Sequence, residues 1–217
     1  MTPAIDRSGP QIDEKLNHLL VQAGLAPLQP VLGDSFAAYL ALILRWNARL
    51  NLTAIRDEDG ILERHFVECI ACARAIPAEV HTLLDFGSGA GFPGIPIALC
   101  RPGMTVTLAE SQGKKAAFLH EAARTLGLRI QIHSGRAEAL TAPFDCVTLR
   151  AVDKMDQAIP AAVALVRPEG WLVPMTTETD LARIRRLAGS EFVWAESLPL
   201  PGGEQRIVAL GQRQCST

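Results

Sequence analysis

Four glycines and a proline lie within ten residues, in the stretch DFGSGAGFPG at residues 85–94. The apolar run HTLL precedes this stretch, and a helix-like segment follows it. Glycine lets the backbone turn sharply and lets a ligand approach without interference from a Cβ atom. In α/β proteins, a loop that leads from a strand into a helix lies at the edge of the sheet where ligands bind. The stretch therefore predicts a ligand-binding loop.

The glycine spacing is compatible with two nucleoside ligands. Residues 89–94 match the G-x-G-x-x-G pattern of dinucleotide-binding loops, whereas residues 85–91 match the D-x-G-x-G-x-G pattern of loops that bind S-adenosylmethionine. Pro93 favours the second ligand, because proline offers no N–H group to a pyrophosphate at the start of a helix. The Asp85 carboxylate would repel a pyrophosphate but suits the cationic methionine end of S-adenosylmethionine. We therefore predict that the loop binds a nucleoside without phosphates.

Glu110 supports a nucleoside ligand of either kind. It ends the next predicted strand, TVTLAE, about 20 residues beyond the glycines. An acidic side chain at this point accepts hydrogen bonds from the ribose hydroxyls of a bound nucleoside. We expect Glu110 to bind the ribose.

If the bound nucleoside is S-adenosylmethionine, the protein transfers a methyl group to an acceptor. The end of the predicted strand at residues 144–149 limits which atom that acceptor can be. Arg150, Ala151 and Val152 follow this strand, where enzymes that methylate exocyclic amines carry an Asp/Asn-Pro-Pro-aromatic tetrapeptide. Methylation of a pyrimidine carbon needs an activated thiolate, and Cys146 lies inside the apolar strand, where we expect it to be core. Guanine N7 has an in-plane lone pair and no proton to lose, so its alignment with the sulfonium methyl group suffices for transfer. Arg150 could hydrogen-bond guanine O6 or a phosphate.

His65, Cys69 and Cys72 fall at i, i+4 and i+7 of one predicted helix, a spacing that would place three possible metal ligands on one face. A zinc site would need a fourth ligand, and no second cysteine pair exists. Core packing is the better interpretation, and no metal is predicted. The five cysteines are an odd number scattered among apolar residues, which suits a reducing cytoplasm.

The elements that must position these residues change character along the chain. Asp34 is predicted to cap a first helix, and residues 60–76 predict a second that ends before Pro77. From residue 81, short apolar runs alternate with helix-like segments, which indicates a mainly parallel sheet closed by a hairpin around residues 199–203. We predict an α/β, Rossmann-like S-adenosylmethionine-dependent methyltransferase fold. An N-terminal helical cap (1–78) and the core (79–217) would form one continuous unit.

The composition limits how the protein could contact nucleic acid or a membrane. The 217 residues suffice for one large domain with a substantial core, and a net charge of −2 means that any nucleic-acid contact must come from a local basic face. No apolar run reaches the roughly 18 residues that a membrane span needs. The first 15 residues contain no apolar signal core, so secretion is not expected. We expect a cytoplasmic protein with no membrane partner.

At this point the motifs resemble a known family. DFGSGAGFPGIPIAL, LAESQGKKAAFL, GRAEAL, LRAV and the upstream NLTAIRD and ERHFVE are similar to the bacterial glucose-inhibited division protein B family (GidB, or RsmG), over about residues 34–210. The resemblance implies a methyltransferase that acts on N7 of a single guanine, guanine 527, of 16S ribosomal RNA. This chain departs from the family pattern at one position, since many members carry a lysine where it has Thr176.

The resemblance, together with the loop analysis, yields a set of site residues. It implies that Gly87 and Phe92 line the cofactor, that Ala137 and Glu138 border its adenine, and that Arg150 lies between cofactor and substrate. The expected S-adenosylmethionine-binding residues are Asp85, Gly87, Gly89, Gly91, Phe92, Glu110, Ala137, Glu138 and Arg150. The RNA-binding candidates are Arg64, His65, Lys114, Arg136 and Arg206. Arg150 would position substrate and cofactor, with no general base.

Two other functions stay open at this level. A nucleotide-dependent oxidoreductase using NAD(P) is compatible with the literal G-x-G-x-x-G spacing, and a nucleoside-binding module without enzymatic activity is compatible with the loop alone. For the methyltransferase, the substrate could be naked 16S rRNA, the small ribosomal subunit or an assembly intermediate. We expect a monomer.

Overall fold

The structure is a computed structural model that describes residues 9–152, 154–202 and 205–215. Its centre is a sheet in which five strands run in the order β3-β2-β1-β4-β5, all parallel to their neighbours. These strands are β1 (Thr82–Phe86), β2 (Thr105–Ala109), β3 (Gln131–His133), β4 (Phe144–Arg150) and β5 (Val166–Thr177). The predicted α/β, Rossmann-like fold is confirmed.

Short antiparallel strands complete the sheet beyond β5. They are β6 (Phe192–Trp194), β7 (Leu198–Pro199), β8 (Arg206–Val208) and β9 (Gly211–Arg213). β7 pairs with β8, with Pro199 opposite Ile207, which confirms the predicted hairpin. β8 in turn pairs with the end of β5, so that Arg206 lies opposite Thr177. The hairpin thereby carries Arg206 to the carboxyl end of the parallel strands.

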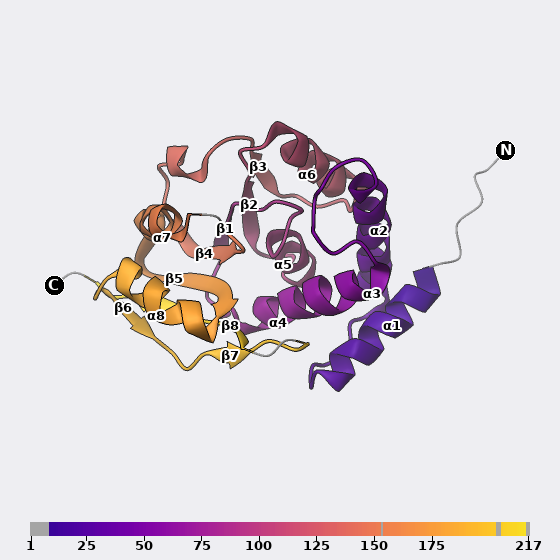
Figure 1. Cartoon of the computed structure of the whole chain (residues 1–217), viewed down its shortest axis with the longest axis horizontal. Coiled ribbons are helices and arrows are strands. Elements are labelled where there is room, and N and C mark those ends of the chain that lie inside the picture. The colour runs from indigo at the N-terminus through magenta and orange to yellow at the C-terminus, as the bar shows by residue number, and fades with distance from the viewer. Residues whose placement is uncertain (1–8, 153, 203–204, 216–217) are drawn as a thin grey trace.

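Helices cover both faces of the sheet (Figure 1). One face packs against α4 (Glu68–Ala75), α5 (Gly94–Cys100) and α6 (Gly113–Thr125), and the other against α7 (Met155–Ala164) and α8 (Glu178–Ala188). Side chains alternate along each strand. Leu83 therefore joins the first core cluster and Leu84 the second. The ligand side is the edge where the parallel strands end.

The N-terminal part is helical, as predicted, but its boundaries differ. Its elements before α4 are α1 (Gly9–Gln22), α2 (Pro30–Asn47), α3 (Glu58–Ile61) and the π-helical segment η1 (Leu62–Val67). α2 begins at Pro30 and not after Asp34, because the fixed φ of proline suits the first helical position. The second predicted helix is present as the run α3, η1 and α4. Its π-helical part carries Arg64 and His65.

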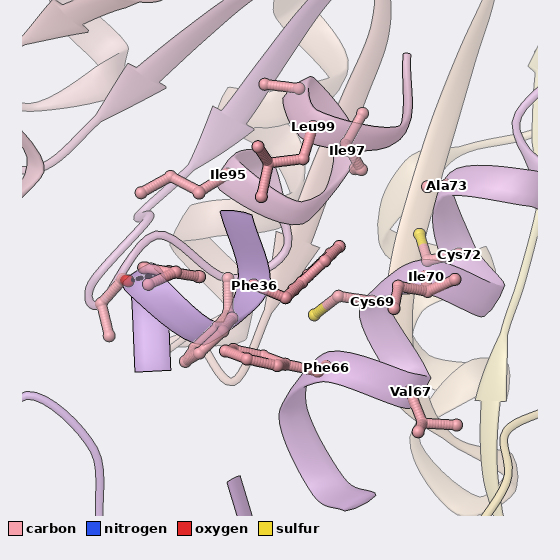
Figure 2. Packing of buried hydrophobic residues seen from close by; sticks show 14 of the residues in the cluster. Phe36, Phe66, Val67, Cys69, Ile70, Cys72, Ala73, Ile95, Ile97 and Leu99 are labelled. Atoms are coloured by element: carbon pink, nitrogen blue, oxygen red, sulfur yellow. Dashed lines mark hydrogen bonds between the residues drawn. The ribbon is translucent and has the colours of Figure 1, made fainter. Parts of the chain in front are cut away.

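The hydrophobic core is continuous from these helices to the sheet. Figure 2 shows Phe36 and Phe66 beside the buried side chains of α4 and α5. Tyr39 of α2 is fully buried, stacks on Phe66 and contacts Phe92. Its Oη donates a hydrogen bond to the carbonyl of Ala90 at 2.5 Å. The helical part thus supports the glycine loop from beneath.

Among residues 9–152, 154–202 and 205–215, none of the helices is both long enough and apolar enough to cross a bilayer.

Candidate functional site

The glycine loop connects β1 to α5 and adopts backbone angles that favour glycine. Gly87, Gly89 and Gly91 have φ values of +77°, +57° and +89°. These angles lie in the left-handed region, which other residues adopt only at a cost. The N–H groups of Gly87 and Ser88 both donate to the carbonyl of Ala109, at 3.0 and 2.9 Å. The loop is therefore tied to the end of β2, next to Glu110.

The start of α5 offers little to a phosphate group. The Gly94 N–H donates to Asp85 Oδ2 at 3.1 Å, and the Ile95 N–H donates to the Gly91 carbonyl at 2.8 Å. Pro93 and the proline at position 96 have no N–H group. Within residues 85–97, all described, no N–H of this first turn is left for an anion. The geometry therefore favours a nucleoside ligand over a dinucleotide.

Asp85 lies beneath the loop and does not line the ligand pocket. Its side chain is buried, and Thr148 Oγ1 approaches Asp85 Oδ1 at 3.4 Å. Burial raises the pKa of Asp85 to about 6, although the hydrogen bond from Gly94 opposes this rise. The expectation that its carboxylate faces the methionine end of the ligand is corrected. Asp85 instead fixes the turn from the loop into α5.

Glu110 is buried at the end of β2 and is held by two backbone groups. Its Oε2 accepts a hydrogen bond from the Gly89 N–H at 2.9 Å, and its Oε1 accepts one from the Gln112 N–H at 2.7 Å. Each carboxylate oxygen can accept a second hydrogen bond. Glu110 therefore links the glycine loop to the start of α6 and keeps acceptor capacity for two neighbouring hydroxyls.

A pocket of about 640 Å³ opens above the loop. Eleven of the predicted site residues line it, namely Arg64, His65, Gly87, Gly89, Phe92, Glu110, Arg136, Ala137, Glu138, Arg150 and Arg206. These residues come from η1, the glycine loop, the ends of β2 and β4, the 3₁₀ turn at 137–139 and β8. The fold thus brings together side chains that are far apart in the sequence.

Three predicted residues do not line this pocket: Asp85, Gly91 and Lys114. Gly91 is turned into the core, since a Cβ there would lie 2.8 Å from the Tyr39 hydroxyl. Lys115 lines the pocket in place of Lys114, because each helical residue rotates the side-chain direction by about 100°.

Sequence reasoning also overlooked lining residues. Residues 52–55 form one wall, and Gln112 and Gln157 contribute polar groups. The position of Gln112, two residues after the acidic end of β2, was a usable signal. Residues 52–55 lie inside the motif NLTAIRD, which contributed to the family resemblance, but no site role was assigned to them.

Arg150 is the centre of a hydrogen-bond network between β4 and the N-terminal helices. Its guanidinium donates to His65 Nδ1 at 2.8 Å, to the Arg64 carbonyl at 2.7 Å and to Glu68 Oε2 at 2.9 Å. It also lies over the Phe92 ring, 5.8 Å from its centroid. Its side chain is only 14% exposed. Arg150 therefore has a fixed orientation at the pocket wall.

His65 is neutral in this network. Arg150 can only donate, so Nδ1 of His65 accepts, and Nε2 carries the proton that it donates to Thr53 Oγ1 at 2.7 Å. The ring stacks on Phe92 with 4.5 Å between centroids. Burial, assisted by the charge of Arg150, lowers the pKa of His65 to about 3. Both ring nitrogens are engaged, and neither is free to take a proton from a substrate.

Glu68 balances three arginines. Its carboxylate, 1% exposed, pairs with Arg150, Arg206 and Arg64. Burial raises the pKa of Glu68, and the charges of Arg150 and Arg206 oppose this rise. Three positive groups around one negative group leave this wall with a net positive charge, which suits an RNA substrate.

Four of the five cysteines are poor nucleophiles in this structure. Cys69, Cys72 and Cys146 are buried, and burial raises the pKa of each thiol. Burial also raises the pKa of Cys100 to about 11. Among the residues that the structure describes, no group of three or more His, Cys, Asp or Glu side chains is arranged to hold a metal ion.

Comparison with known proteins gives one family. A family model described as GidB, rRNA small subunit methyltransferase G, matches residues 33–205. A relative from Xanthomonas oryzae pv. oryzae (strain MAFF 311018), named ribosomal RNA small subunit methyltransferase G, is 44% identical over 82% of this chain and 88% of its own. A relative of the same name from Halorhodospira halophila is 36% identical over 93% of this chain and 95% of its own.

Solved structures share the fold at low identity. The mitomycin 7-O-methyltransferase MmcR matches with a TM-score of 0.62 and 17% identity, over 92% of this chain and 66% of that one. A 1,6-didemethyltoxoflavin-N1-methyltransferase from Burkholderia thailandensis, with S-adenosylhomocysteine bound, matches with a TM-score of 0.58 and 18% identity, over 82% and 90%. These two likenesses establish the fold.

Proposed function

Because the chain belongs to the GidB family, rRNA small subunit methyltransferase G, and is therefore an S-adenosylmethionine-dependent rRNA methyltransferase, we propose that it methylates N7 of a single guanine in 16S ribosomal RNA. Family membership confirms the resemblance seen in the sequence motifs and sets aside the NAD(P)-dependent oxidoreductase and the non-enzymatic module. The acceptor atom and the single target are the proposal.

The observation that carries the N7 proposal is that neither of the two ionisable side chains bonded to Arg150 is free to take a proton from a substrate. His65 is neutral with both nitrogens engaged, and Glu68 is paired with arginines. An amine or hydroxyl acceptor would need to lose a proton, and a pyrimidine carbon would need a thiolate. Guanine N7 needs neither, because its lone pair is available at neutral pH.

The residues that would hold S-adenosylmethionine fit the group. Glu110 offers acceptors to a ribose diol, the bare backbone of Gly87 and Gly89 admits close approach, and small Ala137 leaves room for an adenine. Bound S-adenosylmethionine supplies an electrophilic methyl group on a cationic sulfur. The protein has to align N7 with that methyl group and exclude water, which is the contribution of fixed side chains such as Arg150 and Phe92.

RNA contacts would come from the positive wall and its surroundings. Arg136 is exposed at the pocket rim and pairs with Glu138, while Lys115 lines the pocket near Glu110. Lys114 lies outside the pocket lining, so we place it at most on the outer RNA path. A net charge of −2 gives little non-specific attraction to phosphate, so recognition should depend on folded RNA with splayed bases.

We propose that the protein acts as a monomer. A ribosomal RNA substrate implies a cytoplasmic location. Assays on naked 16S rRNA, assembly intermediates and small subunits would identify the substrate form, and sedimentation of the active protein would test the monomer.

The test of the function is incubation with methyl-labelled S-adenosylmethionine and 16S RNA from cells that lack this gene, followed by nucleoside mass spectrometry. We expect the label in 7-methylguanosine. Label in any other nucleoside would overturn the N7 proposal, and the Glu110→Ala protein serves as the control for cofactor-dependent transfer.

A further inference from the structure

A second cavity, of about 380 Å³, adjoins the cofactor pocket. Its walls come from the ends of β4 and β5, from α7 and α8, and from single residues of η1, α4 and β8. The two cavities share His65, Arg150, Ala151, Val152 and Arg206. Ala151 has a φ of +49°, an uncommon angle for a residue with a side chain. The volume is in the range of small-ligand sites, about 300–1,000 Å³.

The second cavity has largely apolar walls, and its charged side chains include Arg150 and Arg206 with their partner Glu68 on one side, and Asp180. Met155, Ile159 and Met175 contribute apolar surface, which suits the faces of an aromatic base. Arg150 is a donor on the wall shared with the first pocket. Asp180 lies on the part of the wall that the first pocket does not share. A donor and an acceptor thus line the same cavity.

The Asp180 carboxylate keeps acceptor capacity for a ligand. Its Oδ2 accepts a hydrogen bond from Thr177 Oγ1 at 3.1 Å, and its own N–H donates back to Thr177 Oγ1 at 3.2 Å. An ionised carboxylate has about four acceptor sites. The nearby Arg183 is paired with Asp156 of α7. The side chain is therefore oriented by the helix start and still able to bind.

We propose, resting on the proposed function, that this second cavity receives the target guanine and that Asp180 accepts hydrogen bonds from its N1–H and 2-amino groups. With N7 directed toward the first pocket, O6 lies on the side of the Arg150 donor and the N1 edge faces the opposite wall. Adenine presents an unprotonated N1 at that position, which a carboxylate would repel. Asp180 is thereby a specificity-determining residue.

The same contact would assist the transfer. As N7 bonds to the methyl carbon, the carbon–sulfur bond breaks and the positive charge passes from sulfur to the guanine ring, with no proton lost. A positive charge on the ring strengthens the hydrogen bond from N1–H to a carboxylate. The Asp180 contact is therefore stronger in the transition state than in the bound substrate, and such contacts raise the rate.

Asp180 also has a structural role that the test must separate. An acidic residue in the first turn of a helix stabilises that helix, and α8 begins at Glu178. Loss of that role alone would slow methylation of every RNA equally. Recognition of the 2-amino group would instead change the preference between two RNAs.

The experiment uses two ligated 16S RNAs that carry either guanosine or inosine at the methylated position, because inosine lacks only the 2-amino group. Both RNAs are supplied in the same substrate form, whether naked, in an assembly intermediate or in the small subunit, that supports methylation of the guanosine RNA. Initial rates at saturating S-adenosylmethionine are measured for the wild type, Asp180→Ala and the control Asp156→Ala. Asp156 is an exposed carboxylate that pairs with Arg183 of α8 and lines neither cavity.

We expect the wild type and Asp156→Ala to prefer guanosine at least tenfold, which corresponds to about 1.4 kcal/mol. Asp180→Ala should methylate the guanosine RNA at least tenfold more slowly and prefer it less than about twofold. Asp180→Asn provides a second test in case the alanine variant does not fold. It keeps the shape of the side chain and replaces an acceptor by a donor, so it should also lose the preference for guanosine. Equal rates on both RNAs for the wild type, or an intact preference in both Asp180 variants, would overturn the proposal. No methyl transfer by the wild type to guanosine would contradict the proposed function instead.

Discussion

At the residue scale, Glu110 joins the two elements that would hold the ribose. Both of its oxygens already accept backbone N–H groups from the glycine loop and from the start of α6. Glu110→Ala removes a charged acceptor, which typically costs about 1.5–3 kcal/mol. We predict at least a tenfold higher dissociation constant for S-adenosylhomocysteine by calorimetric titration. Glu79→Ala, an exposed carboxylate in the turn before β1, should leave binding unchanged. Unaltered affinity of a folded Glu110→Ala protein would remove Glu110 from the site.

His65 makes stability depend on pH. Its folded pKa of about 3 lies below the ordinary 6.5, so between these values the unfolded chain binds a proton that the folded protein does not. Stability therefore falls as the pH decreases through this range, by up to about 2 kcal/mol from pH 7 to pH 5. Urea unfolding of His65→Gln should lose this part of the slope. His18→Gln, which removes an exposed histidine, should retain the wild-type dependence of stability on pH. The same dependence in His65→Gln would contradict the role of His65.

The sequence predicted single residues better than their partners. Glu110, Gly87 and Gly89 lie at the pocket, as predicted from residue type and position along the chain, whereas Gly91 is turned into the core. The network of Arg150 was not predicted, because Glu68 is 82 residues away and only the fold brings the two together. Asp85 was assigned to the ligand because its type fitted, but whether a strand residue faces the pocket or the loop backbone depends on the register of the strand end.

At the element scale, Arg101 fixes the end of α4, the helix that begins with Glu68. Its guanidinium donates to the carbonyls of Ile76 at 2.9 Å and of Pro77 at 3.2 Å. Arg101→Ala leaves these carbonyls without their charged donor and should lower the free energy of unfolding by about 1.5–3 kcal/mol. A lower urea midpoint at an unchanged slope would show this. The exposed Arg129→Ala should change stability by less than about 0.5 kcal/mol, and equal effects of the two would refute the capping role.

Elements with strong local patterns were predicted well. The strand predicted over residues 144–149 matches β4 to within one residue, since its apolar run is bounded by polar residues. α8 was not recognised, although Thr177 caps it and Leu181, Ile184 and Ala188 recur at helical spacing. The π-helical turn of η1 has no sequence signature, because it depends on packing against the loop and Phe92.

At the scale of the whole molecule, one core cluster joins the N-terminal helices to the sheet, across the predicted boundary at residues 78–79. We predict that the full chain unfolds in a single transition, with equal calorimetric and van't Hoff enthalpies. A fragment of residues 79–217 would expose the apolar surface of α5 and should not fold alone. Two separate transitions, or a stably folded fragment, would contradict the single unit.

The proposed transfer of a methyl group to N7 of one guanine in 16S rRNA can be tested directly on the RNA. An N7-methylated guanine is labile to borohydride and aniline, so it can be mapped by strand scission. We predict that 16S RNA from cells lacking the gene, after treatment with this protein and S-adenosylmethionine, is cut at one guanine, and that the Glu110→Ala protein at the same cofactor concentration leaves the RNA largely uncut. Methyl label incorporated into an RNA that is not cut, or label found on an exocyclic amine, a pyrimidine carbon or a ribose, would contradict the claim.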